Sequence, residues 1–428
     1  MVTTGTAMGT GPAPSSADAA RDWARSGVLP LTGHRTGPPL MPPGHAASWA
    51  ALMADHIAQA TAGDRRPVLT DGPRLLAERA ALTGRSRQGA VSVGGSCRLH
   101  RTLDGWAAVS VARPDDPALW SALIGHELDD RFPARLAAWL AAHPGAELDQ
   151  RTEMLGLAGG AVHLRLFPRG GPPVRPGRPR SVQGLLVVDF SALWAGPLCA
   201  NLLGLAGAEV VKVEMPDRPD GARGGNPAFY DLLHCGHRSV VLDPADQGGR
   251  EALHALVRRA DIVIEASRPR ALARFGLDAD AEVERGCVWV SITAAGRRSQ
   301  RVGFGDDVAA GAGLLARDGA GLPVFCGDAI ADPLTGLTAA ALALSEPEDG
   351  RGGVLWDLAM ADLVGATLTD SLSSTAALAN SAAGWAVDAG GAYVLVEPPV
   401  ARTPVGGASA MGADTGAVLA RLGISTAW

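Results

Sequence analysis

The second half of the chain alternates short apolar runs with helical stretches. Four runs rich in Val and Ile stand at 185–190 (LLVVDF), 208–215 (AEVVKVEM), 261–266 (DIVIEA) and 287–292 (CVWVSI). A helix that opens at Gly196-Pro197 follows the first run, and another is predicted over 248–259. This alternation is typical of βαβ units, so it predicts an open α/β domain with a parallel sheet covered on both faces. Ligands of such sheets bind beyond the carboxyl ends of the strands, which here are followed by residues 191–197 and 266–274.

The first half has a different pattern. Residues 98–111 alternate in polarity and turn at Asp104-Gly105, which predicts a β-hairpin. Apolar positions near helical spacing predict helices around this hairpin, at 48–62, 73–82, 118–126 and 132–143. A small α+β domain is therefore expected ahead of the α/β domain. The stretch 168–181 (PRGGPPVRPGRPRS) predicts a linker, and the small polar residues 1–20 predict a flexible tail.

Composition and charge narrow the classes of function. Gly and Pro supply 55 and 30 of the 428 residues, so loops are abundant. The formal net charge is −6, with no dense basic run, which argues against a nucleic-acid-binding surface. Of the 38 basic residues, Lys212 is the only lysine, a bias to which we attach no function. Small molecules or proteins are the expected partners.

Cysteine spacing and hydropathy indicate in which cellular compartment the protein is expected. The five cysteines are far apart and form no C-x-x-C pair, which predicts neither a zinc site nor a disulfide framework. The sequence contains no apolar run of the ~18 residues that span a bilayer, and its first residues lack the pattern of a secretory signal. We therefore expect a cytoplasmic protein that does not bind membranes.

Common catalytic motifs are missing from the sequence. The first β–α turn, FSALWAGP, has one glycine rather than G-x-G-x-x-G, which argues against a dinucleotide site although Glu214 ends the second strand where a ribose-binding acid would stand. P-loop, H-E-x-x-H and G-x-S-x-G motifs are also absent. These absences disfavour the usual nucleotide, zinc-protease and α/β-hydrolase functions.

Four separated segments do resemble a known family. They read QGLLVVDFSALWAGPLCANLLGLAGAEVVKVEMPDRPDGAR, HCGHRSVVLD, ADIVIEASRPRALARFGL and GDAIADPLTGLTAAALAL, in that order between residues 183 and 344. Together they resemble the large domain of the family III CoA-transferases, which include acyl-CoA racemases. The resemblance implies a Rossmann-like domain that binds coenzyme A, a smaller second domain, a homodimer and a nucleophilic aspartate at the start of a helix. Acyl-CoA and a carboxylic acid would be substrates, with no metal and no permanently bound cofactor.

By motif position, the family's catalytic aspartate corresponds to Asp332. Asp328 is the nearest competitor. Asp-Pro is also a common helix start, with Asp as N-cap and Pro at the first helical position, and both roles are compatible. A carboxylate at a helix N-terminus is expected to stay ionised because of the helix dipole and the free N–H groups. Oxyanion donors are expected from the backbone near Gly94-Gly95 or within 311–313.

The resemblance also implies contacts to coenzyme A, whose phosphates favour cations and helix N-termini. The sequence departs from the family where His237 replaces a lysine, where Ala266-Ser267 replaces Asn-Phe, and where Gly311 replaces a frequent glutamine. The expected contacts are the backbone of Ala192, Leu193, Trp194 and Ala195, followed by His237, Arg238, Ser267, Arg268 and Arg274.

The order of the parts differs from that of the family. Residues 21–40 resemble the segment that leads into the nucleophile helix. Asp332 lies nine residues after Pro323, and the same count from Pro39 leads to Ser48. A serine cannot replace the nucleophilic carboxylate, so this first copy is catalytically blank. We expect a degenerate family-like segment with the small α+β domain at 21–167, a linker at 168–181, the catalytic α/β domain at 182–370, and an extension at 371–428 that completes the fold.

Three functions remain open on the sequence. The first is CoA transfer through an aspartyl mixed anhydride and an aspartyl-CoA thioester on Asp332. The second is racemisation of an acyl-CoA, which the sequence disfavours because Asp306 stands where racemase-like members have a histidine. The third is a non-catalytic CoA-binding subunit.

Overall fold

The central sheet of the protein has six parallel strands in the order β11-β8-β7-β4-β5-β6. The computed structural model describes residues 14–163, 175–266, 270–347, 352–368, 378–381 and 384–424. The strands are β4 (Leu186–Asp189), β5 (Glu209–Glu214), β6 (Arg238–Val241), β7 (Ile262–Glu265), β8 (Val288–Thr293) and β11 (Val354–Ala359). The four strands expected from apolar runs are confirmed, and the open parallel α/β fold with them. The first strand, β4, lies between β5 and β7, so the chain changes direction across the sheet between β4 and β7.

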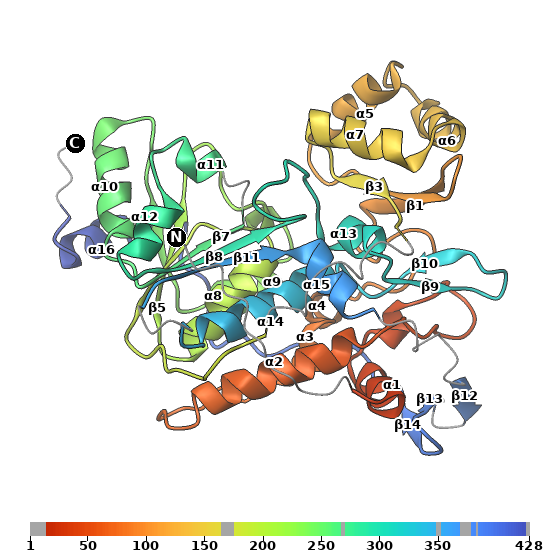
Figure 1. Cartoon of the computed structure of the whole chain (residues 1–428), viewed down its shortest axis with the longest axis horizontal. Helices are drawn as coiled ribbons and strands as arrows, with labels where there is room; N and C mark the ends of the chain where they lie inside the picture. The colour runs from red at the N-terminus through yellow and green to blue at the C-terminus, as the bar shows by residue number, and fades with distance from the viewer. Residues whose placement is uncertain are drawn as a thin grey trace.

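Helices cover both faces of this sheet (Figure 1). One core contains Val187 and the other contains Leu186 and Val188, as the period of two in a strand requires. The first core packs under α8 (Ala195–Leu205) and α14 (Ala331–Ala343). The second packs under α10 (Gln247–Val257), α12 (Ala279–Glu284) and α16 (Thr415–Arg421). Burial on both faces explains why these strands read as continuous apolar runs.

The N-terminal helices join the first of these cores. They are α1 (Ser16–Arg25), the 3-10 turn η1 (Leu29–Leu31), α2 (Ala46–Ala60), α3 (Gly72–Leu75) and α4 (Glu78–Thr83). Helix α2 packs on α14, where the indole Nε1 of Trp49 donates to the Oγ1 of Thr338 at 3.0 Å. Helix α1 begins inside the expected flexible tail, of which residues 1–13 lie outside the described residues. The expected helix at 73–82 consists of two short helices.

A smaller α+β unit lies to one side of the sheet (Figure 1). Its antiparallel strands are β1 (Cys97–Arg101), β2 (Trp106–Ser110) and β3 (Gly159–Ala161), and its helices are α5 (Asp116–Ile124), α6 (Phe132–Ala142) and α7 (Gly145–Leu155). The hairpin around Asp104-Gly105 is confirmed. Helix α7 begins directly after Pro144, which is its N-cap, because Pro is well tolerated at the start of a helix. The unit has its own core around Trp120.

The remaining elements connect these parts. They are η2 (Gly221–Gly224), α9 (Pro227–His234), α11 (Arg270–Ala273), α13 (Gly305–Gly311), β9 (Leu315–Arg317), β10 (Pro323–Phe325) and α15 (Met360–Ala366). Strands β12 (Leu378–Ser381), β13 (Gly384–Asp388) and β14 (Tyr393–Leu395) form an antiparallel sheet beside α1. The expected linker falls partly outside the described residues, at 168–174. Within the part of the chain that the structure describes, every helix is too short or too polar to cross a membrane.

Candidate active site

Asp332 is the second residue of α14, and its side chain is partly exposed to solvent. The N-cap of this helix is Ile330, so the expectation that Asp332 caps the helix is wrong. Pro333 falls within the first turn, where no helical hydrogen bond is lost. Within the described residues, no hydrogen-bond donor reaches the Asp332 carboxylate. Its oxygens are therefore free to meet a ligand.

Helix α13 brings two further carboxylates to the start of α14. Asp306 accepts a hydrogen bond from the backbone N–H of Ala329 at 2.8 Å. Asp307 accepts one from the hydroxyl of Ser110 at 2.8 Å and one from the N–H of Phe304 at 3.0 Å. Ala329 has a positive φ of 46°, which is uncommon for a residue with a side chain. Such strain is found where the surrounding structure enforces it, often at functional sites.

Asp328 is fully buried and bound to an arginine of the N-terminal helices. The Nε of Arg79 donates to its Oδ2 at 2.8 Å, and Nη2 donates to its Oδ1 at 2.5 Å. The Asp328 side chain has no exposed surface. A carboxylate that is enclosed and occupied in this way is a poor nucleophile, which favours Asp332 over its competitor.

Burial and neighbouring charges raise the pKa of three carboxyl groups of the site, Asp332, Asp306 and Asp307. Burial raises the pKa of Asp332 to about 7; the positive charge of Arg79 opposes this, and the charges of Asp306, Asp307 and Asp328 reinforce it. Burial, with a neighbouring negative charge, also raises the pKa of Asp306 and of Asp307 to about 6. The expectation that the helix terminus keeps Asp332 fully ionised at neutral pH therefore differs from the structure, since desolvation of the carboxylate is the larger effect.

The first β–α turn of the sheet lies at the point where the strand order reverses, and buried charges hold it. Asp189 accepts from the N–H of Ser191 at 2.8 Å. The Nζ of Lys212 donates to the carbonyl of Ser191 at 2.8 Å and pairs with Asp220 at 2.9 Å. Asp220 in turn accepts from the N–H of Leu193 at 3.0 Å, and Leu193 has a φ of 70°. Ligands of open α/β sheets bind at this point of the fold.

The expected CoA contacts other than His237 fall into three groups. The turn Ala192–Ala195 stands at the start of α8, and Leu193 within it is 42% exposed. Arg274 is exposed and has no ion-pair partner within the described residues, while Arg238 is exposed and pairs with Asp414 at 3.2 Å. Ser267 and Arg268 lie outside the described residues.

The last expected contact, His237, does not have the exposed side chain that a contact to a phosphate needs. Its imidazole is buried, neither nitrogen has a hydrogen-bond partner in the described part of the chain, and burial lowers its pKa to about 3. A neutral, enclosed ring cannot bind a phosphate at the surface. The geometry thus removes the His237 side chain from the candidate contacts.

Of the two expected sources of oxyanion donors, the Gly94-Gly95 loop lies nearer the carboxylates. A β-carbon on Gly94 would be 3.7 Å from Oδ2 of Asp306 and 3.4 Å from Nη2 of Arg79. Gly311 ends α13, opposite its carboxylate-bearing first turn, and its carbonyl accepts from the N–H of His163 at 3.0 Å.

Ser48, the position that sequence counting pairs with Asp332, lies near the start of α2. Ser48 is the third residue of α2, whereas Asp332 is the second of α14, so Ala47 is the equivalent position by helix start. Neither Ala47 nor Ser48 carries a carboxylate. The Ser48 hydroxyl donates to Asp22 at 2.5 Å.

Sequence reasoning missed several residues that shape this site. Arg79 and Ser110 belong to segments far from Asp332 in the chain, and no local pattern marks them. Lys212 was noticed only as the one lysine of the protein. Its position in an otherwise apolar run was a usable signal, because a lysine is rarely fully buried without a partner.

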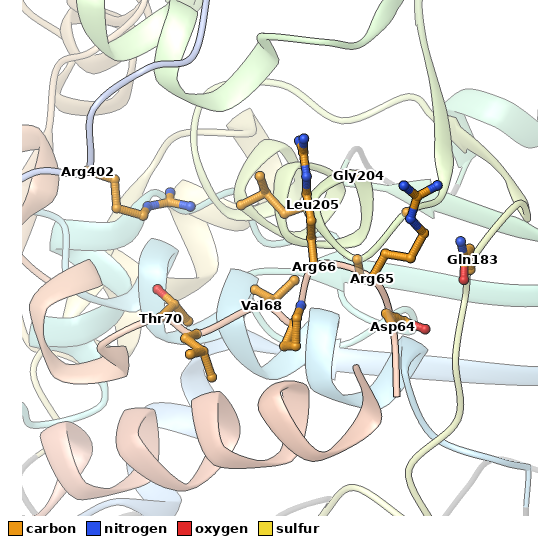
Figure 2. Close-up of a pocket in the computed structure, with 13 residues that line it drawn as sticks. Asp64, Arg65, Arg66, Val68, Thr70, Gln183, Gly204, Leu205 and Arg402 are labelled. Carbon is orange, nitrogen blue, oxygen red and sulfur yellow. The ribbon is translucent and has the colours of Figure 1, made fainter. Parts of the chain in front are cut away.

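A pocket of about 760 Å³ lies away from this site (Figure 2). Arg65, Arg66 and Arg402 line it together with residues 204–207, at the C-terminal end of α8. The turn at 192–195 and Gly336 of α14 lie at the opposite end of α8, where a β-carbon on Gly336 would stand 2.3 Å from the carbonyl oxygen of Ala195. Groups of His, Cys, Asp and Glu able to hold a metal ion do not occur in the described ranges.

The fold and the site define an open α/β protein with a carboxylate beside its topological switch point. Residues 182–386 match the model of CoA-transferase family III, so the resemblance noted in the sequence is confirmed for this region. The succinate–glutarate CoA-transferase of Agrobacterium fabrum is 30% identical over 218 residues, which are 46% of this chain and 54% of that protein. A formyl-CoA:oxalate CoA-transferase of Rhodopseudomonas palustris is 35% identical over 104 residues, 23% of this chain and 24% of that protein.

The chain thus spans about half the length, or less, of these curated relatives. A solved CaiB/BaiF family protein of Brucella suis is 25% identical, with a TM-score of 0.43, over 49% of this chain and 66% of that one.

Proposed function

We propose that the protein transfers coenzyme A between an acyl-CoA thioester and a carboxylic acid, with Asp332 as the nucleophile. The observation that carries the proposal is the accessible carboxylate of Asp332, which accepts no hydrogen bond within the described residues and has a pKa of about 7. At neutral pH about half of the molecules hold it ionised, and desolvation makes the ionised form reactive.

The chemistry follows from carboxylate attack on a thioester. Asp332 attacks the thioester carbonyl, which forms an acyl–aspartyl anhydride and releases CoA thiolate. The thiolate attacks the aspartyl carbonyl, which forms an aspartyl-CoA thioester and frees the first acid. The incoming carboxylate attacks this thioester and gives a new anhydride, from which the thiolate takes the new acyl group and restores Asp332. The backbone N–H groups of the Gly94-Gly95 loop are proposed to stabilise the tetrahedral oxyanions.

Coenzyme A is proposed to lie across the switch point. The backbone at 192–195 faces the start of α8, where free N–H groups favour an anion. Arg238 and Arg274 are proposed to meet the phosphates, as are Ser267 and Arg268. No permanently bound cofactor is needed for this chemistry.

Racemisation of an acyl-CoA is the second candidate function. Asp306 replaces the histidine of racemase-like members, and its pKa of about 6 suits proton transfer far better than that of an ordinary carboxyl group. A non-catalytic CoA-binding role is the third, and an accessible carboxylate at position 332 disfavours it.

One experiment separates the three functions. The protein is incubated in heavy water with a 2-methylacyl-CoA and a free carboxylic acid, and both products are followed by mass spectrometry. We expect CoA to move to the added acid without deuterium at the α-carbon. Deuterium entering faster than CoA transfer would establish the racemase function, and binding without either change would establish the subunit role.

The resemblance also implies a homodimer, which remains a prediction. Sedimentation velocity should give a species of twice the 43.7 kDa chain mass. An active species with the mass of one chain would contradict it.

A further inference from the structure

Arg79 of α4 contacts both the loop before α14 and the turn before α8. It belongs to α4, in the segment ahead of the small α+β unit and outside the family match at 182–386. Its guanidinium forms the bidentate pair with buried Asp328, and it also lies over the ring of Trp194, 4.8 Å from the ring centroid. Trp194 is the N-cap of α8 and lies within the turn at 192–195 that is proposed to bind CoA. One side chain thus joins the loop before Asp332 to that turn.

The position of Arg79 is fixed by contacts of its own helix. The adjacent Glu78 is buried and pairs with Arg402, whose Nη1 donates to Asn201 of α8 at 2.9 Å. The carbonyl of Leu82 accepts from the side chain of Asn226 at 3.3 Å. Helix α4 is therefore anchored to α8 and to the start of α9, and the guanidinium needs little rearrangement to act.

Among the described residues, the charged groups that act most on Asp332 are one cation and three carboxylates. Arg79 comes from α4, Asp306 and Asp307 come from α13, and Asp328 comes from the loop before α14. The carboxylates of Asp306 and Asp332 both interact electrostatically with Arg79. Arg79 is the one positive charge in this set, and removing it leaves only negative neighbours.

We propose that Arg79 is a positioning residue whose positive charge, held beside the start of α14 by Asp328, favours the ionised form of Asp332, so that the N-terminal half of this same chain completes the catalytic site. The expected effect of Arg79 on catalysis rests on the proposed function. Its expected effect on the protonation of Asp332 does not depend on that function. The N-terminal half also contributes Ser110, which holds Asp307, and Gly94, which adjoins Arg79.

The test is a carboxylate titration of the full-length protein, with activity measured in parallel. The protein is labelled with ¹³C at aspartate carboxyl carbons, and the Asp332 resonance is assigned by its loss in Asp332→Asn. We expect its midpoint near pH 7 in the wild type and at least one pH unit higher in Arg79→Gln. The kcat at pH 7 should then fall about fivefold or more and recover towards the wild-type value near pH 9, because only the ionised fraction has changed. Arg79→Lys should restore part of the shift, and Arg65→Gln, an exposed arginine of the same half, should shift nothing.

A second pair of variants covers the case in which Arg79→Gln leaves Asp328 unpaired and the protein unfolds. Asp328→Asn should lower the Asp332 midpoint, because it removes a negative charge that raises the pKa of Asp332 and leaves the charge of Arg79 unpaired. Adding Arg79→Gln to it should raise the midpoint again. Equal midpoints in Asp328→Asn and in the double variant would overturn the inference, as would a loss of activity that is the same at every pH. If the wild type transfers no CoA but the midpoints shift as stated, the proposed function fails and the role of Arg79 stands.

Discussion

Gly305 and Asp332 approach so closely that no β-carbon fits between them. A β-carbon on Gly305 would lie 2.7 Å from Oδ2 of Asp332 and 2.3 Å from the carbonyl oxygen of Ala329. The first of these neighbours is the proposed nucleophile, and the second belongs to the strained residue that precedes its helix. Close packing here fixes the position of the carboxylate relative to α13.

Gly305→Ala should therefore damage both the fold and the activity. Because backbone atoms stand in the way, we expect a loss of about 1–3 kcal/mol in the free energy of unfolding and a fall in kcat of more than tenfold. Gly319→Ala is the matched control, since a β-carbon there meets nothing within 4 Å. Urea unfolding and steady-state kinetics of the two variants check this, and equal behaviour would contradict the packing argument.

Asp332→Asn should abolish CoA transfer and leave the fold intact. The amide has nearly the same shape, and no hydrogen bond from the described residues to the carboxylate is lost. Hydroxylamine added during turnover should trap an adduct on Asp332 of the wild type, located by peptide mass spectrometry, and none on the variant. Retained transfer, or an adduct on Asp328, would assign the nucleophile elsewhere.

The sheet was predictable because its strands are local patterns. A run such as 185–190, buried on both faces, is apolar without interruption, and the helices between such runs have their own spacing. Strand β6 escaped this reasoning because Arg238–Val241 is short and begins with an exposed charge. Asp332 was recognisable only through the motif around it.

The electrostatic part of the site was not predictable from local sequence. Arg79 and Asp328 are 249 residues apart, and only the packing of the N-terminal helices against the α/β domain brings them together. The pKa of Asp332 depends on four groups from three elements. Burial of His237 likewise follows from tertiary packing, which a motif position cannot report.

Stability should depend on pH through Asp332. Its pKa in the folded protein is raised to about 7 from 3.8, so the folded state favours the protonated form. This stabilisation is complete below pH 4 and is lost as the pH rises to about 7. Asp332→Asn, which is always neutral, should match the wild type near pH 4 and exceed it above pH 7 by up to about 4 kcal/mol. Denaturant unfolding at both pH values checks this, and a constant difference would mean that the pKa is not raised.

The buried pair Lys212–Asp220 should be needed for both stability and ligand binding. Lys212→Met removes the ion-pair partner of the buried Asp220, so we expect a loss of about 3–5 kcal/mol in the free energy of unfolding. Arg421→Met, which breaks the exposed pair with Glu209, should cost about 1 kcal/mol or less. Lys212→Met/Asp220→Asn should recover part of the loss in stability. Both residues hold the turn at 191–193, so CoA affinity measured by calorimetry should stay weak in that double variant. Wild-type affinity in the double variant would mean that the pair does not position the turn for CoA binding.

The final prediction concerns the phosphates of coenzyme A. Arg238 and Arg274 are both exposed, but among the residues that the structure describes only Arg238 has an ion-pair partner, Asp414. A charge-assisted hydrogen bond contributes about 1.5–3 kcal/mol, so Arg274→Gln should weaken CoA binding about tenfold or more. Arg238→Gln should have a smaller effect, because the free protein already satisfies that guanidinium in part and binding must compete with Asp414.

Dephospho-CoA identifies which phosphate each arginine meets. It should bind the wild type weakly, and the variant that has lost the contact to the 3′-phosphate should bind CoA and dephospho-CoA almost equally. Arg178→Gln is a suitable control, since Arg178 is 81% exposed, lies 3.8 Å from Glu346 and precedes the α/β domain. Unchanged CoA affinity in both Arg238→Gln and Arg274→Gln would mean that other residues meet the phosphates.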